Sequence, residues 1–289
     1  MLARIQAILT EAVLAGAREV VKARRAGDVD ARFKDPTELI TEADMRSDAA
    51  MLAVLESHRH ALDAAISFRL EESGMIGEPG SKRIGADPLD GTSHFASGGN
   101  LYSVQAHYIE DGVPLVAAIF QPELYLPLAI APECSGRLVV ASRGAGAFVQ
   151  RATFSGDAFT LDVPKPVHAL PLTGPRTIVA CVPVTSKMKP EERALAQRVY
   201  ESGVVGAMTG TGNAGGNVMM IVFGGQDVYA NFGAGEELDL APPQVIAEEV
   251  GLTVWGLDRK PPVWHVRKQP FVVARTPELA ERVLSAAGL

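Results

Sequence analysis

The sequence predicts a mixed α/β (α+β) fold, because helical and strand-like hydrophobic patterns alternate along its 289 residues. Apolar residues recur at helical spacing over residues 2–24, whereas residues 102–120 alternate like two strands joined at Asp111-Gly112. A chain of this length fits one large α/β unit or two tightly joined halves. We therefore expect one compact unit whose halves are residues 1–165 and 166–289.

In the N-terminal half, each expected element follows from its periodicity or from the residues at its ends. The expected elements are helices at 2–24 and 41–58 and strands at 64–68, 102–109, 113–120, 126–131, 137–141 and 159–163. Thr41 is expected to cap the second helix, because Asp44 follows it in a capping-box-like position. A loop containing Lys34, Asp35 and Pro36 is expected before this helix.

In the C-terminal half, glycine-rich and proline-rich segments separate shorter periodic runs. The expected elements are strands at 177–182, 227–231 and 271–274, helices at 191–202, 212–223 and 238–250, and a C-terminal helix. The proline-rich stretches near 164–175 and 261–263 are expected to be loops, and the first is the expected seam between the two halves.

Composition argues against several classes of protein. Hydrophobic residues make up 47% of the chain and charged residues 21%, as in ordinary globular proteins. The net charge of −7 argues against a nucleic-acid groove, and no apolar run reaches the length of a membrane span. Charged residues within the first helical pattern argue against a signal peptide. Cys134 and Cys181 are too few for a disulfide framework, so we expect core cysteines in a cytoplasmic protein.

The most informative segment is Asp87-Pro88-Leu89-Asp90-Gly91-Thr92. Pro88 stiffens this turn, so both carboxylates and the Leu89 carbonyl can converge on one point, and such hard oxygen ligands suit Mg²⁺ or Mn²⁺. If a helix follows, the N–H groups of Gly91 and Thr92 can cradle a phosphate beside the metal. Asp-Gly and Asp-Pro are also common turn dipeptides, so the assignment depends on further carboxylates elsewhere.

Further carboxylates do stand at the ends of other predicted elements, and with them the chain resembles the inositol monophosphatase family of magnesium-dependent, lithium-sensitive phosphatases. The matching segments are 41–44, 71–74, 87–92 with Phe95, and 239–241, with weaker matches at 141–148, 212–214 and 224–229. They occur in family order over roughly residues 30–255. The resemblance implies a layered α-β-α-β-α sandwich.

The resemblance also implies a role for each matching residue. The implied metal ligands are Glu71, Asp87, the Leu89 carbonyl, Asp90 and Asp239, which would hold two or three Mg²⁺ ions sensitive to Li⁺. The implied catalytic residues are Asp44 and Thr92, which would activate the attacking water, and Glu72, a supporting base. The implied substrate-binding residues are Gly91, Thr92, Asn213, Ala214 and Asn231. The expected partners are a small phosphorylated metabolite and a second copy of the chain in a homodimer.

Several of these residues have structural alternatives. Asp44 and Asp239 can be ordinary acids in the first turn of a helix, and Thr92 can be a helix cap. Glu71 and Glu72 can form a solvated acidic turn, and Lys34 can be a loop lysine. His94 can protonate a leaving group or simply pack against its neighbours.

The chain departs from the family pattern where the family reads its substrate. Leu238 stands in the place of a tryptophan, and Asn231 in the place of a glutamate that hydrogen-bonds sugar-like hydroxyls. One extra residue precedes Asp239, and either Glu236 or Glu237 can substitute for the missing glutamate.

Three classes of function follow from these observations. The first is a Mg²⁺-dependent phosphomonoesterase for a small polyol or sugar phosphate resembling inositol 1-phosphate. A 3′(2′),5′-bisphosphate nucleotidase or a histidinol-phosphate phosphatase would share its metal ligands and differ in the substrate wall. The second is a non-catalytic regulatory or binding protein that retains the fold, and the third is a metal-binding module without phosphatase chemistry.

Overall fold

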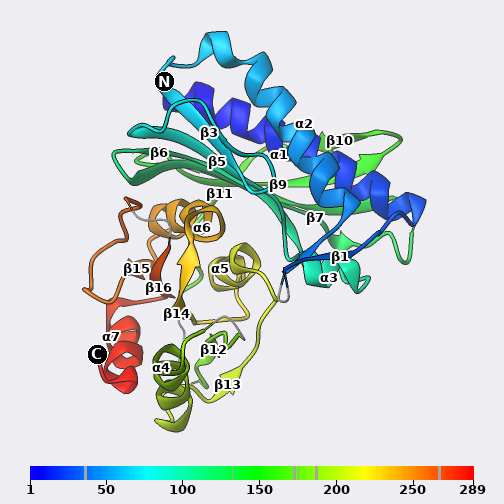
Figure 1. The fold of residues 1–289 in the computed structure, drawn as a ribbon. Helices are drawn as coiled ribbons and strands as arrows, with labels where there is room; N and C mark the ends of the chain where they lie inside the picture. The colour runs from blue at the N-terminus through cyan, green and yellow to red at the C-terminus, as the bar shows by residue number, and fades with distance from the viewer. Residues whose placement is uncertain (36–37, 132, 172–173, 175, 186–187, 266–267) are drawn as a thin grey trace.

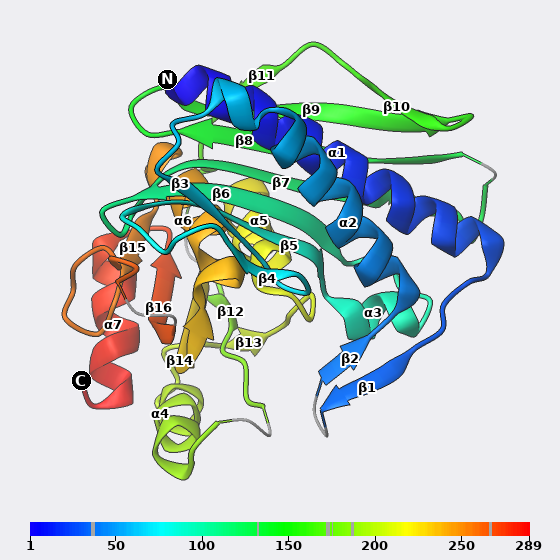
Figure 2. The same cartoon turned by 45° about the horizontal axis from the view of Figure 1, so that its top comes forward.

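The computed structural model of the protein describes residues 1–289 except 36–37, 132, 172–173, 175, 186–187 and 266–267. Figures 1 and 2 show five layers, in which helices cover both outer faces of two sheets and also fill the space between them. The layers are α1 (Leu2–Ala26) with α2 (Glu42–Ser57), a large sheet, α5 (Ala214–Phe223) with α6 (Glu237–Glu249), a smaller sheet, and α4 (Pro190–Glu201) with α7 (Pro277–Ala287). This arrangement confirms the predicted α-β-α-β-α sandwich.

The large sheet has nine strands and carries most of the predicted site. Its order is β10 (Ala158–Leu161), β9 (Gly146–Ser155), β8 (Cys134–Ser142), β7 (Val113–Leu126), β6 (Ser103–Glu110), β5 (Lys82–Asp90), β3 (Ile66–Leu70) and β4 (Gly74–Ile76), with β11 (Lys165–Val167) paired to β9. Strands β6 and β7 form the predicted antiparallel hairpin, whereas β3 and β5 run parallel.

Both faces of the large sheet are buried, and alternate residues of its central strands belong to different cores. On β7, Val116, Ala118 and Phe120 pack against α1 and α2, whereas Ala117 and Ile119 pack in the core shared with α5 and α6. This alternation follows from the two-residue period of a strand. A polar side chain on the second face of this sheet therefore points toward α5 or α6.

The smaller sheet has five strands in the order β13 (Ala207–Met208), β12 (Val179–Cys181), β14 (Val228–Glu236), β16 (Lys268–Ala274) and β15 (Thr253–Trp255). It lies between α5 and α6 on one side and α4 and α7 on the other (Figure 1). Separate hydrophobic cores fill these two spaces. Strand β14 leads directly into α6, so the small sheet delivers the start of that helix to the face of the large sheet.

Local signals correctly predicted several features. Thr41 and Asp44 form a capping box at the start of α2. Cys134 and Cys181 are free and buried, as expected of core cysteines. Among the described residues, no helix combines the length and apolar composition needed to cross a membrane.

Several expectations about secondary structure are wrong. The loop expected near 164–175 contains β11, because Lys165–Val167 pairs with β9. The strand expected at 126–131 does not form beyond Leu126, because Pro127 lacks the N–H group that a ladder needs and the chain turns there. The expected loop near Lys34 and Asp35 is instead β1 (Arg32–Asp35), which pairs with β2 (Glu38–Ile40). Pro36 of that loop lies outside the described residues.

Candidate active site

The site begins with an irregularity in β5 at Pro88 and Leu89. Asp87 faces Gln105 of β6 and Asp90 faces Ser103, so three steps along β5 match two along β6. In a regular strand, Asp87 and Asp90 would point to opposite faces of the sheet. The extra residue of this bulge returns both carboxylates to the face covered by α5 and α6. The strand therefore continues through a segment that the sequence predicts as a turn.

Three aspartates come together on this face. Carboxylate oxygens of Asp87, Asp90 and Asp239 all lie within 4.8 Å of one another, and Asp239 belongs to the first turn of α6. Glu71 follows the end of β3; part of the residue is exposed, but its carboxyl group is buried and hydrogen-bonds Asp87. The structure thus gathers four of the five predicted metal ligands through their carboxyl groups.

Three of these carboxyl groups, those of Glu71, Asp87 and Asp90, have pKa values raised above those of ordinary acids. Burial, followed by the charges of Glu71 and Asp90, raises the pKa of Asp87 well above its usual range. Burial also raises the pKa of Asp90 to about 7, and burial together with the charge of Asp239 raises the pKa of Glu71 to about 8. Clustered acids that resist ionisation in water-poor surroundings are suited to a divalent cation, which would neutralise their repulsion.

The fifth predicted ligand is the Leu89 carbonyl, which lies inside the bulge. The Leu89 N–H donates to Asp87 Oδ1 over 2.9 Å, and the Leu89 carbonyl oxygen lies 3.0 Å from Thr92 Oγ1. Gly91 directly precedes the short helix α3 (Thr92–Ala96), and its φ of 99° favours glycine. The tight turn places Thr92 and the Leu89 carbonyl on the same side of the segment.

Asp44 and Thr92, the predicted pair for water activation, are in contact. Thr92 Oγ1 lies 3.0 Å from Asp44 Oδ1, whereas the Thr41 N–H and hydroxyl donate to Asp44 Oδ2 over 2.8 and 2.5 Å. Burial raises the pKa of Asp44 to about 6, although hydrogen bonds from Thr41 and Thr92 oppose the shift. The capping role and the contact with Thr92 therefore coexist in one carboxylate, one oxygen serving each.

Both the carboxylate and the backbone of Glu72 are held in place by neighbouring residues. Its carboxylate forms an ion pair with Lys34, with Lys34 Nζ 2.8 Å from Glu72 Oε2, and its N–H donates to Asp48 Oδ1 over 3.1 Å. The hydroxyl of Ser73 also donates to Asp48. Asp48 was not among the predicted site residues, although it lies one helical turn after Asp44, on the same face of α2.

Asn213 and Ala214 stand at the start of α5, beside Asp90. Asn213 is the N-cap, its side-chain oxygen accepting from the Gly216 N–H while its Nδ2 donates to the Leu101 carbonyl over 2.8 Å. The Gly215 N–H donates to Asp90 Oδ2 over 3.0 Å. The start of α5 thus holds Asp90, a predicted metal ligand, and the side-chain amide of Asn213 is engaged within the protein.

Asn231 contacts Tyr229 and the backbone of Gly233. Its Nδ2 lies 3.4 Å from Tyr229 Oη, and its Oδ1 accepts from the Gly233 N–H over 2.9 Å. The charges of Asp239 and Asp90 contribute to the raised pKa of the buried Tyr229 phenol, after burial itself. Between Asn231 and Gly235, four steps along β14 match two along β16, so extra residues bulge from the strand beside the site.

Glu236 and Glu237, the suggested substitutes for the family's glutamate, are both engaged in ion pairs. Glu236 pairs with Arg69 and Lys268. Glu237 is buried and pairs with Arg83 at 2.7 Å. Burial opposes its ionisation, but hydrogen bonds from His107 and Arg83 lower the pKa of Glu237 to about 2. Glu237 therefore points into the large sheet.

His94 packs against the loop that leads to Asn213. A Cβ atom on Gly212 would lie 2.3 Å from His94 Cδ2, and one on Gly99 would lie 3.1 Å from His94 Nδ1. These close approaches favour the packing role for His94.

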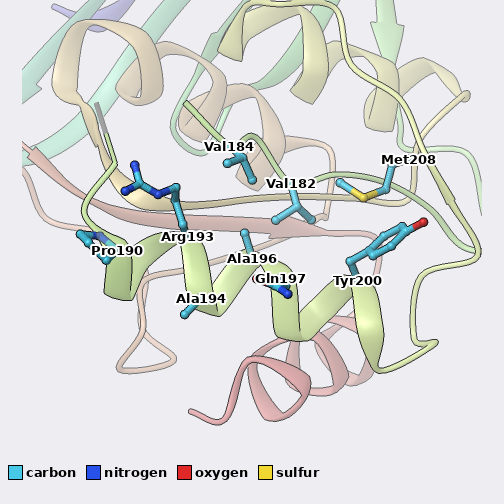
Figure 3. A pocket seen from close by; sticks show the side chains of 9 residues that line it. All are labelled: Val182, Val184, Pro190, Arg193, Ala194, Ala196, Gln197, Tyr200 and Met208. Atoms are coloured by element: carbon cyan, nitrogen blue, oxygen red, sulfur yellow. The ribbon is translucent and has the colours of Figure 1, made fainter. Parts of the chain in front are cut away.

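A separate cavity of about 510 Å³ lies between α4 and the strands β12 and β13 (Figure 3). Apolar side chains such as Val182, Val184 and Met208 face Tyr200 and Arg193 across it. None of the described residues that line it is acidic, and none is a predicted site residue. The hard oxygen ligands needed for divalent cations are therefore found at the aspartate cluster.

Solved structures with this architecture cover nearly the whole chain. The extragenic suppressor protein suhB from Bartonella henselae superposes with a TM-score of 0.75 at 18% identity, covering 98% of both chains. The inositol monophosphatase from Anabaena (Nostoc) sp. PCC 7120 superposes with a TM-score of 0.69 at 20% identity, covering 99% of this chain and 95% of that chain. At such identities, these similarities support the fold alone.

Sequence similarity to curated proteins is confined to part of their length. The Inositol-1-monophosphatase of Synechocystis sp. (strain ATCC 27184 / PCC 6803 / Kazusa) is 32% identical over 126 residues, which cover 40% of this chain and 39% of that protein. Phosphatase IMPL1, chloroplastic, of Arabidopsis thaliana is 33% identical over 90 residues, covering 31% and 23%. The sequence profile of the inositol monophosphatase family, in contrast, matches residues 1–288. The chain therefore belongs to the inositol monophosphatase family.

Proposed function

We propose that the protein is a Mg²⁺-dependent phosphomonoesterase that hydrolyses a small polyol or sugar phosphate. The observation that carries this proposal is that two groups of residues meet at the end of β5. One is the cluster of Asp87, Asp90 and Asp239, whose oxygens lie within 4.8 Å of one another. The other is the contact of 3.0 Å between Asp44 and Thr92. Together they offer cation ligands and a proton acceptor beside a predicted phosphate cradle.

The residues present fit a divalent cation by their chemistry. All five proposed ligands offer hard oxygen atoms, and the crowded carboxyl groups of Glu71, Asp87 and Asp90 have raised pKa values. They are Glu71, Asp87, the Leu89 carbonyl, Asp90 and Asp239. Two or three Mg²⁺ ions, with Mn²⁺ as an alternative, would supply a water of lowered pKa and neutralise charge on the phosphate.

The chain's own residues then handle the proton and the phosphate. The Asp44 carboxylate orients the Thr92 hydroxyl, and this pair accepts a proton from the attacking water. Glu72, held by Lys34 and Asp48, serves as the supporting base. The N–H groups of Gly91 and Thr92 bind phosphate oxygens and restrain the group for attack.

Sensitivity to Li⁺ is part of the proposal. A staphylococcal inositol monophosphatase with a TM-score of 0.68 and 17% identity, covering 93% of this chain and 89% of that chain, was solved as a LiCl-soaked inhibitory complex. The proposed ligands of the present chain are mostly carboxylates, so we expect Li⁺ to compete for one of their cation positions. A cytoplasmic homodimer remains a prediction from the family resemblance.

Phosphate release from a panel of phosphomonoesters tests the proposal. The panel contains inositol 1-phosphate, several sugar phosphates, fructose 1,6-bisphosphate, adenosine 3′,5′-bisphosphate and histidinol phosphate, each with Mg²⁺, with EDTA and with added Li⁺. We expect Mg²⁺-dependent turnover of a polyol or sugar phosphate above the others. Preference for either of the last two compounds would instead assign the corresponding activity. Folded protein that binds Mg²⁺ but hydrolyses nothing would favour a regulatory protein.

A further inference from the structure

The first turn of α6 carries Asp239 but lacks several of the hydrogen bonds that usually hold such a turn. Glu236, the N-cap residue, makes no side-chain cap hydrogen bond. Pro242 and Pro243 lie inside the helix and have no N–H to donate to the carbonyls of Leu238 and Asp239, four residues earlier. The position of Asp239 must therefore be set by contacts outside the helix.

The large sheet supplies one of these contacts through Gln105 of β6. Gln105 Nε2 donates to the Leu238 carbonyl over 3.3 Å, which replaces the hydrogen bond that Pro242 cannot make. The same Nε2 atom lies 3.5 Å from Asp87 Oδ2. One buried side chain therefore connects the residue before Asp239 with a second carboxylate of the cluster.

The stronger contact is made by Glu237. Arg83 of β5 donates through Nε to Glu237 Oε1 over 2.9 Å and through Nη2 to Oε2 over 2.7 Å, a bidentate arrangement. Arg69 Nη1 donates to Oε2 over 3.3 Å, and His107 Nε2 lies 3.2 Å from Oε1. Burial lowers the pKa of His107, and the hydrogen bond to Glu237 opposes that shift.

These contacts and the metal site lie on the same face of β5. Arg83, Gly85 and Asp87 alternate with the core residues Ile84 and Ala86 and face α6. Glu237 of α6 pairs with Arg83 of β5. Farther along both elements, Asp239 of α6 lies close to Asp87 of β5.

Glycine at position 85 allows α6 to approach this face closely. A Cβ atom on Gly85 would lie 2.9 Å from Leu238 Cδ2 and 2.3 Å from His107 Cε1. Leu238, which lies between Glu237 and Asp239 in α6, therefore packs closely against the β5 backbone at Gly85.

We infer that Arg69, Arg83, His107 and Glu237 form an anchor that positions Asp239 as a metal ligand. This inference rests on the proposed function, because it concerns how α6 completes the proposed cation site. The anchor residues touch neither substrate nor metal in this account; they are positioning residues. Without the anchor, the first turn of α6 loses its lateral support, and Asp239 no longer converges with Asp87 and Asp90.

The test measures the metal affinity of a variant in which the change in charge and the loss of positioning should have opposite effects. Removing the positive charge of Arg83 would, by charge alone, strengthen binding of a nearby cation. Loss of positioning would weaken it. For Arg83→Gln we expect Mn²⁺ binding, measured by electron paramagnetic resonance titration, to weaken by roughly tenfold or more, as when other groups that orient ligands are lost. Glu237→Gln should weaken it similarly.

Arg275→Gln is the matched control. Arg275 pairs with the buried Asp227 at 2.9 Å, so its loss also removes a buried ion pair. Asp227 precedes the start of β14, whereas α6 follows the opposite end of that strand. We expect this variant to melt at a lower temperature while binding Mn²⁺ like the parent. Arg83→Lys keeps the charge but not the bidentate geometry, so it should fold and give an intermediate loss of affinity.

The possible results separate this inference from the proposed function. Arg83→Gln and Arg83→Lys that both bind Mn²⁺ at least as tightly as the parent would overturn the anchor, whatever the enzyme hydrolyses. Equal loss of affinity in Arg275→Gln would also overturn it, by showing that general destabilisation is sufficient. A parent that binds Mn²⁺ but hydrolyses no phosphomonoester would reject the proposed function and leave the anchor supported by its own data. A parent that binds no Mn²⁺ would reject both.

Discussion

The side of the site formed by β5 and α3 is built largely from residues close in sequence, whereas the side formed by β14 and α6 depends on distant ones. Leu89 and Asp87, two residues apart, bond within the bulge, and Thr92 reaches the Leu89 carbonyl three residues away. Glu237, in contrast, is held by Arg83, which is 154 residues away in the sequence. The side formed by β5 and α3 thus depends strongly on contacts within a short motif, and the side formed by β14 and α6 on the packing of whole layers.

This difference explains how the two sides can diverge separately. The proposed metal ligands of β5 should keep their arrangement as long as the bulge and Gly91 are retained. The start of α6 can use any set of side chains that holds Asp239 against that face. In this chain, the set includes Arg83, Glu237 and a glycine at position 85.

The largest expected effect comes from Asp90→Asn on the β5 side. We expect turnover to fall by roughly 10³-fold or more, because transition-state charge loses part of its stabilisation. The melting temperature of the metal-free variant should nevertheless equal or exceed that of the parent, since a repelling charge is removed from the cluster. Steady-state phosphate release and thermal melting in EDTA measure the two effects. Parent-like hydrolysis by this variant would refute the metal assignment.

The next effect concerns Thr92→Ala, which removes the hydroxyl between Asp44 and the Leu89 carbonyl. We expect kcat to fall by roughly 10²- to 10⁴-fold, the range for losing general acid–base assistance, while Mn²⁺ affinity stays close to that of the parent. Thr92→Ser is the matched control, because it keeps the hydroxyl. A Thr92→Ala variant with normal kcat would mean that the Asp44–Thr92 contact is only structural.

The pH dependence of stability should distinguish the acidic cluster from the rest of the protein. The raised pKa values of Asp90, about 7, and Glu71, about 8, exceed their ordinary values of 3.8 and 4.5. Between about pH 4 and pH 8, the folded metal-free protein therefore binds more protons than the unfolded chain. The contribution of the cluster to stability consequently falls as pH rises through this range. Urea unfolding in EDTA at several pH values measures this slope. Asp90→Asn should make it shallower, and an unchanged slope would argue against the cluster as its source.

The smallest effect is expected on the β14 side. Asn231→Ala removes a side chain that lies beside Tyr229 and bonds the bulged segment, without removing a proposed metal ligand. We expect the ratio of kcat/KM between two phosphomonoesters to change by about tenfold, as for a lost hydrogen bond of ~1.4 kcal/mol. The Mg²⁺ concentration giving half-maximal activity should change little. A large change in that concentration with an unchanged substrate ratio would show that Asn231 serves the metal side instead.

Features that depend on neighbouring residues can be predicted from the chain alone. Helical spacing predicts α1, and Thr41 with Asp44 predicts the capped start of α2. The segment from Asp87 to Thr92 indicates oxygen ligands beside a phosphate cradle, because proline, glycine and clustered acids limit what such a turn can do. These signals are local in origin, so they are visible in a single chain.

Only the tertiary structure decided which of these groups meet and on which face. The bulge that returns Asp87 and Asp90 to one face depends on the register between β5 and β6. Strands β4 and β15 have three residues each, too short to show a period. Glu237 appeared free to read substrate in the sequence, yet α6 presses it onto Arg83. Register and long-range pairing depend on how the entire chain buries its surfaces, and no short sequence pattern contains that information.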